Sequence, residues 1–282
     1  MDSEVRNRET RARAEDALVR FALLAGEHAR DYVVIGGLNP DFLATSAPVP
    51  HQGTTDIDLL FALGLDNVTD SSDFSWVDTA LEAGGFTSTN GWRWDATLGN
   101  ARVRLEFLCD VWDHTGDTVP LPGSDRAQAS KIAGPAAALH APVERELTVS
   151  AAVRADTPEV PATVTLRFAN LGGYLLAKAA AAQSRMLPKD KYDLMYVALY
   201  NDGGPRGAAR AVARQLAATE DSSDPAEIRL VMERYLDPKG VWAGVFASTM
   251  IRTGDPTPED QLRVDGAEGA RSFLDELDSA SS

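Results

Sequence analysis

Two β-like runs separated by a glycine pair dominate the pattern of apolar and polar positions in the N-terminal half of the chain. Residues 33–35 form a continuous apolar run that stops at Gly36 and Gly37, which predicts a buried strand. Residues 54–61 alternate between polar and apolar side chains, which predicts a strand with one polar face. Together with their connection, the runs predict a strand–helix–strand unit.

Two carboxylates fall on the polar face of the second predicted strand. Asp56 and Asp58 are two residues apart, so their side chains point the same way. Like charges that close raise each other's pKa unless a cation or solvent relieves them. Mg²⁺ gives that relief, and it prefers carboxylate oxygens shared with a substrate's phosphates. The pair therefore predicts a metal site; the alternative is a solvated strand face.

The glycine pair adds a possible phosphate contact. Asn39 is expected to cap a helix that follows Gly36 and Gly37, with Pro40 in its first turn. Backbone N–H groups at such a turn bind phosphate oxygens, assisted by the dipole of the helix. A phosphate cradle beside a carboxylate pair predicts a nucleoside triphosphate (NTP) site.

The periodicity of the other segments separates a mixed N-terminal part from a helical C-terminal part. An amphipathic helix is expected at residues 10–29. Further strands are expected at residues 92–97, 101–109, 144–154 and 164–168. Helices are expected at residues 171–186, 189–200, 206–219, 225–235, 241–251 and 267–277. Proline, alanine and glycine are frequent in residues 118–164, so the domains expected are 1–150 and 151–282.

A second group of charged residues falls in the helical part. Lys178 and Arg185 are seven residues apart on one predicted helix, so they share a face. Asp190 and Asp193, three apart on the next predicted helix, also share a face. These four side chains predict either a nucleotide clamp or a buried ion network between the two helices.

Composition narrows the class of protein. The 282 residues carry a net charge of −15, which argues against a surface coated by nucleic acid. Residues 167–214 nevertheless contain eight basic and three acidic residues, so one face is expected to meet phosphate. The single cysteine, Cys109, fits a reducing compartment. No signal-peptide pattern and no apolar run of membrane-spanning length is present, so a cytoplasmic location without a membrane partner is expected.

These motifs resemble a known superfamily. A glycine pair followed by D-x-D on a strand is similar to the polymerase-β-like nucleotidyltransferases. Lys178, Arg185 and the run K-D-x-Y-D-L at residues 189–194 resemble, within it, the AbiEii/MenT-type nucleotidyltransferase toxins of bacterial toxin–antitoxin and phage-defence systems. The resemblance covers about residues 33–199. It implies an α/β (α+β) fold, with an N-terminal nucleotidyltransferase lobe built on a mixed sheet and a C-terminal helical lobe closing over the nucleotide.

The resemblance also implies the roles of individual residues. Asp56 and Asp58 would bind Mg²⁺, with two ions expected, and Lys178 would lie near the triphosphate. Asp193 corresponds to the aspartate of the family's K-D-x-Y-D motif, with Asp190 beside it. The reaction implied is transfer of a nucleoside monophosphate (NMP) to the 3′ end of tRNA, with an antitoxin protein as a further partner.

The same resemblance places a third carboxylate on the strand expected at residues 101–109. Glu106 lies on the polar face of that strand and is the candidate, with Asp110 as the second choice. It would complete the metal site or accept the proton of the acceptor hydroxyl. A salt bridge from Glu106 to a neighbouring arginine is the alternative interpretation.

The chain departs from the family pattern at two positions. Gly37 stands where many superfamily members have serine, and Gln52 stands where family members often carry arginine. Both departures bear on substrate affinity more than on fold. Two other functions stay open: an antibiotic nucleotidyltransferase, because an acidic surface suits a cationic aminoglycoside, and a non-catalytic nucleotide-binding module.

Overall fold

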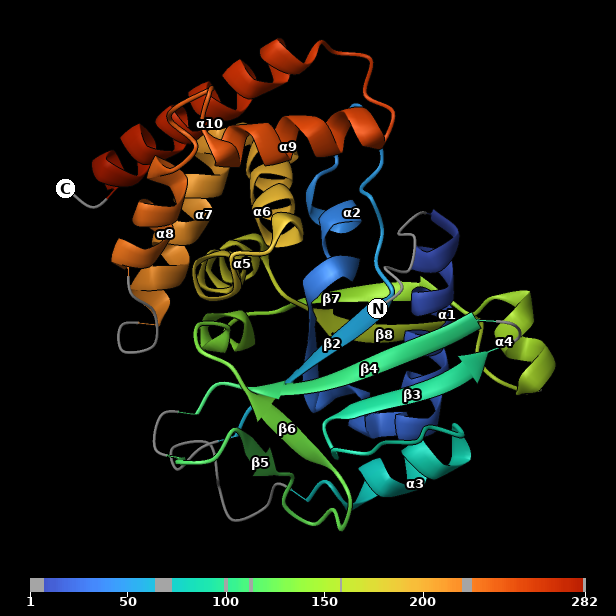
Figure 1. Cartoon of the computed structure of the whole chain (residues 1–282). Helices are drawn as coiled ribbons and strands as arrows, with labels where there is room; N and C mark the ends of the chain where they lie inside the picture. The colour runs from blue at the N-terminus through green and yellow to red at the C-terminus, as the bar shows by residue number, and fades with distance from the viewer. Residues whose placement is uncertain are drawn as a thin grey trace. The chain divides into compact units, whose positions relative to one another are not determined.

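The strands form one mixed sheet in the computed structural model (Figure 1). They are β1 (Tyr32–Ile35), β2 (Asp56–Phe61), β3 (Arg93–Leu98), β4 (Ala101–Cys109), β5 (Thr118–Pro120), β6 (Gln128–Lys131), β7 (Val143–Thr148) and β8 (Thr163–Phe168). Their order is β5-β6-β4-β2-β1-β8-β7, with β3 paired to β4. The β1/β8, β2/β4 and β4/β6 pairs are parallel and the others antiparallel, as a mixed sheet requires.

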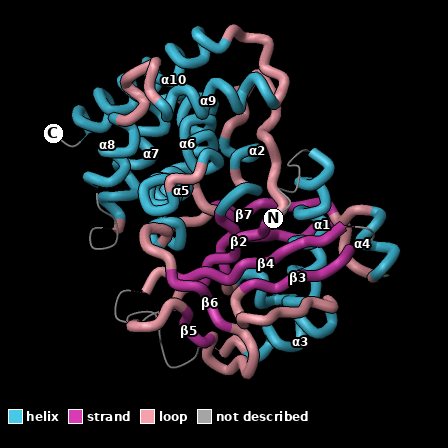
Figure 2. Tube along the Cα trace, viewed as in Figure 1, coloured by secondary structure: helices cyan, strands magenta, loops and turns pink. Residues whose placement is uncertain are grey.

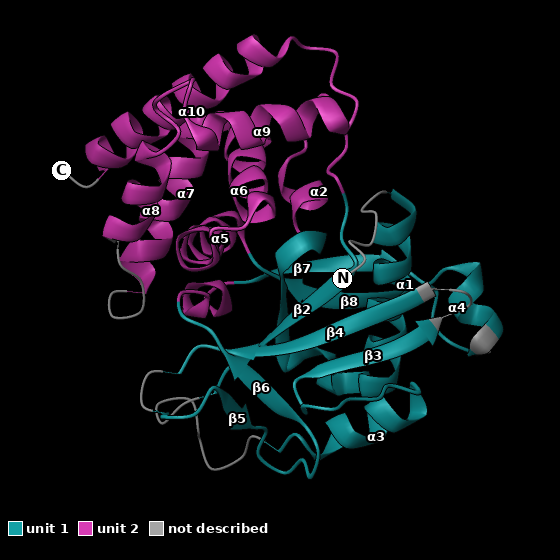
Figure 3. Ribbon diagram, in the orientation of Figure 1, with its two compact units in different colours: residues 1–38, 53–133, 142–169 teal, residues 39–52, 134–141, 170–282 magenta. Residues whose placement is uncertain are grey.

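The structure describes residues 8–63, 73–98, 101–111, 114–157, 159–219 and 225–280. The chain divides into two compact units, which Figure 3 shows in different colours. Unit 1 consists of residues 1–38, 53–133 and 142–169 and contains the whole sheet. Unit 2 consists of residues 39–52, 134–141 and 170–282.

Helices cover one face of the sheet in unit 1 (Figure 2). This unit contains α1 (Arg8–Ala25), α3 (Ser75–Ala83), α4 (Ala151–Asp156) and the 3₁₀ turns η1 (Gly26–Arg30) and η2 (Gly36–Leu38). Phe21 of α1 lies at the centre of an aromatic cluster. Its ring centroid lies 5.9–6.1 Å from those of Tyr32, Trp76, Phe86 and Phe107. Large aromatic side chains dominate the apolar area that such a core buries, so this cluster anchors α1 and α3 to the sheet.

Unit 2 is helical in its described residues. It contains α2 (Pro40–Leu43), η3 (Ala136–Leu139), α5 (Leu171–Arg185), α6 (Pro188–Tyr200), α7 (Gly204–Ala218), α8 (Pro225–Glu233), α9 (Val241–Arg252) and α10 (Glu259–Ala280). Helix α5 packs against α6, α7 and α8, and α10 packs against α7 and α9. Across the described part of the chain, no helix is both long and apolar enough to cross a membrane.

The compact units do not divide the chain at residue 150, where the two expected domains meet. Strand β8 belongs to unit 1 because it pairs with β1 and β7, so the last crossing between units falls between residues 169 and 170. Residues 39–52 and 134–141 belong to unit 2, although residues of unit 1 flank them in the chain. The composition of these two segments does not show that they belong to unit 2, because their contacts with residues far away in the chain place them there.

Most expected elements match the observed ones within two residues, but three predictions were wrong in extent. The helix expected at residues 10–29 is α1, which ends at Ala25, and a 3₁₀ turn follows it because Gly26 has a φ of +61°. Residues 144–154 were expected to be one strand, yet β7 ends at Thr148 and the chain then enters α4. Ser150 causes this change, because its side chain accepts a hydrogen bond from the Val153 N–H and caps the helix. The helix expected at residues 267–277 is the longer α10, whose acidic first turn carries no apolar signal.

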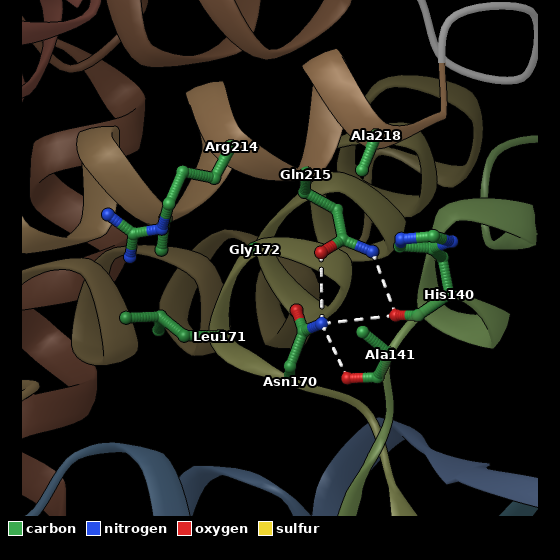
Figure 4. Close-up of a pocket in the computed structure, with 9 residues that line it drawn as sticks. His140, Ala141, Asn170, Leu171, Gly172, Arg214, Gln215 and Ala218 are labelled. Atoms are coloured by element: carbon green, nitrogen blue, oxygen red, sulfur yellow. Dashed lines mark hydrogen bonds between the residues drawn. The ribbon is translucent and has the colours of Figure 1, made fainter.

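Asn170 caps α5 and also ties three segments of unit 2 together (Figure 4). Its Oδ1 accepts a hydrogen bond from the Gly173 N–H at 2.8 Å. Its Nδ2 lies 3.1 Å from the His140 carbonyl oxygen, 3.0 Å from that of Ala141 and 2.9 Å from Gln215 Oε1. Asn170 and its partners His140, Ala141 and Gln215 form part of the wall of a pocket of about 410 Å³.

We predict that Asn170→Ala lowers the free energy of unfolding by about 2–3 kcal/mol, because the variant loses a helix cap and leaves other polar groups without their partner. Ser150→Ala is the matched control, since Ser150 caps the short α4 and makes one such hydrogen bond. Ser150→Ala should lower the free energy of unfolding by only about 1 kcal/mol. Urea unfolding measures both, and equal losses would contradict the wider role of Asn170.

Candidate functional site

The predicted carboxylates of unit 1 lie on the polar face of β2. Ile57 and Leu59 are fully buried on the opposite face, whereas Asp56 and Asp58 are half-buried. Strand β4 runs parallel to β2, and its register places Glu106 next to Asp58. Neighbouring strands lie roughly 5 Å apart, so the three predicted carboxylates share one small surface. Asp110 lies beyond the end of β4.

Arginines from β3 and β4 occupy the same face. Arg93 Nε donates to Glu106 Oε1 at 2.8 Å, which is the salt bridge that the alternative interpretation of Glu106 requires. Arg104 NH1 lies 3.8 Å from Asp56 Oδ1, and its Nε donates to Asp95 Oδ1 at 3.0 Å. On this face, acidic and basic side chains therefore contact one another, and the acids do not form an isolated group.

The backbone of Gly36 lies directly against Asp58. Gly36 has a φ of +77°, and a Cβ at this position would be 1.8 Å from Asp58 Oδ2. A Cβ on Gly37 would be 2.6 Å from the Thr54 Cβ and Oγ1. Only glycine fits at Gly36, because the backbone is left-handed and there is no room for a side chain. Gly37 is in turn tightly constrained by Thr54.

The helix expected after the glycine pair is shorter than the phosphate argument requires. Helix α2 has only four residues, and the Asn39 side chain does not cap it. Asn39 adopts a helical backbone conformation instead of the extended one of a cap. So short a helix has only a small dipole. Any phosphate contact at Gly36 and Gly37 would therefore come from the backbone N–H groups of the 3₁₀ turn alone.

The carboxylates of unit 1 differ in how well they suit Mg²⁺. Among the residues that the structure describes, no three His, Cys, Asp or Glu side chains form a metal-binding group. Mg²⁺ often binds proteins through one or two carboxylates and takes its other oxygens from water and substrate phosphates. Asp56 and Asp58 fit that arrangement, whereas the bond to Arg93 makes Glu106 a weaker candidate for a ligand.

In unit 2, the predicted charged residues of α5 and α6 form a buried ion network. Lys178 Nζ lies 2.7 Å from Asp193 Oδ2 and 3.3 Å from Asp190 Oδ1. Arg185 NH2 lies 2.9 Å from the same Asp190 oxygen. Asp190 and Asp193 are almost completely buried, whereas half of the Arg185 side chain is exposed. The helical spacing predicted this grouping correctly, and both interpretations of it require these contacts.

His51 also belongs to the network, and the sequence did not identify it. Its Nε2 lies 2.8 Å from Asp193 Oδ1, and both side chains are buried. Gln52 Nε2 reaches the same oxygen at 3.5 Å. A histidine five residues before the D-x-D motif is the only local signal, since 142 positions separate His51 from Asp193.

The network determines the ionisation of Asp193. Burial by itself would raise the pKa of this carboxyl group, but Lys178 and His51 outweigh burial and hold the pKa well below its ordinary value. Asp193 therefore stays ionised in the folded protein. Because its folded pKa lies below its unfolded pKa, Asp193 stabilises the protein above about pH 4, and this contribution disappears as pH falls further.

Lys191 does not contribute to a solvent-facing basic surface, contrary to what the local charge implies. It is buried, and its Nζ lies 5.0 Å from the centroid of the Trp242 ring. The Tyr235 hydroxyl donates to the Lys191 carbonyl oxygen at 2.5 Å. The charge of Lys178 is likewise enclosed, so the excess of basic residues in residues 167–214 overstates the charge offered to a partner.

Comparisons with known proteins add little to this geometry. No protein-family model and no curated protein sequence matches the chain. Among solved structures, the crystal structure of JHP933 from Helicobacter pylori aligns with 98% of this chain and 96% of its own. The two share 11% sequence identity, and the TM-score is 0.42. Similarity at this level establishes neither a common fold nor a common activity.

We predict that Gly36→Ala destabilises unit 1 more than Gly26→Ala does. Both glycines have positive φ, so both variants should lose about 1–2 kcal/mol. No atom lies within 4 Å of a Cβ built at Gly26, whereas Asp58 overlaps one at Gly36, which adds about 1–3 kcal/mol. Chemical unfolding of the two variants measures the difference. Equal losses would contradict the close contact.

We predict that Asp193→Asn lowers the free energy of unfolding at pH 7 by about 3–5 kcal/mol, because Lys178 loses a buried partner. The difference in free energy of unfolding between wild type and variant should become smaller as pH falls below about 4, because the wild type then loses the contribution of Asp193. Urea unfolding between pH 7 and pH 3 measures this gap. Asp275→Asn, at an exposed site in α10, is the control; a gap that stays constant with pH would contradict the prediction.

Proposed function

We propose that the chain is a metal-dependent nucleotidyltransferase of the polymerase-β-like type, which transfers an NMP from an NTP to an acceptor hydroxyl. The observation that carries the proposal is the seating of Asp58 against the Gly36 backbone, with Asp56 on the same strand face. This geometry supports a binding site in which two carboxylates and a glycine turn meet a charged substrate. The enzyme class comes from the resemblance of the motifs.

In the proposed reaction the acceptor oxygen bonds to the α-phosphorus, the bond from that phosphorus to the bridging oxygen breaks, and pyrophosphate leaves. Asp56 and Asp58 would hold Mg²⁺, which supplies positive charge to the α-phosphate and to the pyrophosphate oxygens. Glu106 would accept the proton of the acceptor hydroxyl. Its Oε1 is bonded to Arg93, and its Oε2 makes no hydrogen bond within the described residues.

Unit 2 would supply the cations for the triphosphate. Lys178 and Arg185 would offset the charge that develops on the leaving pyrophosphate. Asp190 and Asp193 would hold the two cations in place, because each carboxylate bonds at least one of them.

The acceptor proposed first is the 3′ end of tRNA, which would make the protein a toxin of a toxin–antitoxin or phage-defence system with an antitoxin as partner. The half-exposed Arg185 supports a phosphate-bearing acceptor. An aminoglycoside-type drug is the second candidate, because the net charge is −15 and because Lys178 and Lys191 are buried. Because these two lysines are buried, they offer less positive charge to an RNA acceptor.

The test incubates the protein with Mg²⁺, each α-phosphate-labelled NTP and either total tRNA or kanamycin. Label should appear on RNA in the wild type and disappear in Asp56→Ala and Asp58→Ala, because Mg²⁺ loses a ligand. Lys178→Ala should lose roughly 2–4 kcal/mol of transition-state stabilisation. Lys239→Ala, an exposed lysine of the same unit, should match the wild type.

The outcomes separate the candidates. Label on kanamycin and not on RNA would show that the protein modifies a drug and does not act as a tRNA-modifying toxin. Activity retained in both aspartate variants would rule out the metal site. No transfer to either acceptor, together with a large fall in the melting temperature of Lys178→Ala, would favour a non-catalytic protein with a structural ion network.

A further inference from the structure

A buried histidine connects the segment before the D-x-D strand to the ion network of unit 2. His51 lies in residues 39–52, the segment that belongs to unit 2 and ends four residues before Asp56. Only about 1% of its side chain is exposed, so its hydrogen bond to Asp193 is shielded from water. A carboxylate only accepts hydrogen bonds, so His51 Nε2 must carry the proton.

Aromatic contacts determine the position of the His51 ring. The ring stacks on Tyr192, with 5.4 Å between centroids and 23° between planes. It also meets Tyr196 edge-on, with 5.3 Å between centroids. The Tyr196 hydroxyl donates to the Val49 carbonyl oxygen at 2.8 Å, which fixes the backbone just before His51. These contacts direct Nε2 at Asp193.

Asp193 divides its two oxygens between two partners. Oδ1 accepts from His51, and Oδ2 lies 2.7 Å from Lys178 Nζ. A carboxylate held at one oxygen cannot rotate freely, so the bond to His51 determines the direction in which Oδ2 faces Lys178. Gln52 reaches Oδ1 only at 3.5 Å and is a weak substitute.

We propose that His51 is a positioning residue for the nucleotidyl transfer, acting through Asp193 on Lys178. This inference rests on the proposed function, which assigns Lys178 to the triphosphate. His51 would act only through Asp193 and is assigned no contact of its own with substrate or metal. Its effect is to hold the Lys178 ammonium in one place, and a small misplacement of such a group costs catalytic rate more than ground-state binding.

Two substitutions test the hydrogen bond from Nε2 specifically. In His51→Gln, the side-chain amide nitrogen can take the place of Nε2, whereas the shorter side chain in His51→Asn ends near the place of Nδ1 and cannot reach Asp193. His140→Ala is the control, because His140 is an exposed histidine of the same unit whose side chain makes no hydrogen bond within the described residues.

The first readout is the reaction of Lys178 with an amine-acylating reagent, followed by mass spectrometry. It needs neither NTP nor acceptor. Lys178 is almost enclosed, so it should react slowly in the wild type, in His51→Gln and in His140→Ala. In His51→Asn it should react several-fold faster. An unchanged rate in His51→Asn, or an equal rise in His51→Gln, would overturn the inference.

The second readout is steady-state transfer of labelled NMP. His51→Asn should lower kcat by up to about a hundredfold while changing the KM for NTP little, and His51→Gln should restore most of the rate. A rise in KM with unchanged kcat would overturn the positioning role. If the wild type transfers no NMP, the proposed function fails, whereas the acylation result still decides whether His51 positions Lys178.

Discussion

Two carboxylates buried between α5 and α6 constrain the whole of unit 2. Asp190 and Asp193 are almost inaccessible to water, and an unpaired buried carboxylate would cost several kcal/mol. Lys178, Arg185 and His51 provide the compensating contacts. The two helices can pack closely only if these partners are in place. A cluster under this constraint is either a structural network or a prearranged set of charges for a ligand, and the geometry serves both.

The path of the chain explains how His51 reaches that cluster. After Leu38 the chain leaves unit 1, and residues 39–52 pack within unit 2 before β2 begins. The Ser46 N–H donates to the Tyr200 carbonyl oxygen at 2.9 Å and His51 bonds Asp193, so the middle and the end of the segment are both tied to α6. Most of the segment between the glycine pair and the D-x-D motif therefore belongs to the helical unit, while both motifs belong to unit 1.

In unit 1, the crowded carboxylates are compensated by part-exposed arginines instead of by buried partners. The polar face of its sheet balances acids against arginines across three strands, through Arg93 with Glu106 and Arg104 with Asp56. Such part-exposed pairs are cheap to form and weak. They leave Asp56 and Asp58 as the carboxylates best suited to a metal shared with substrate, because the Gly36 backbone fits closely against Asp58.

Local periodicity determined the elements and the faces that individual residues occupy. Alternation along β2 placed Asp56 and Asp58 correctly, and helical spacing grouped the charges of α5 and α6, because both patterns depend on neighbours a few residues away. Only the tertiary structure decided the contacts between distant segments: the bond from His51 to Asp193, the burial of Lys191 under Trp242 and the extent of each unit. These depend on which surfaces pack together, and no local spacing along the chain encodes that choice.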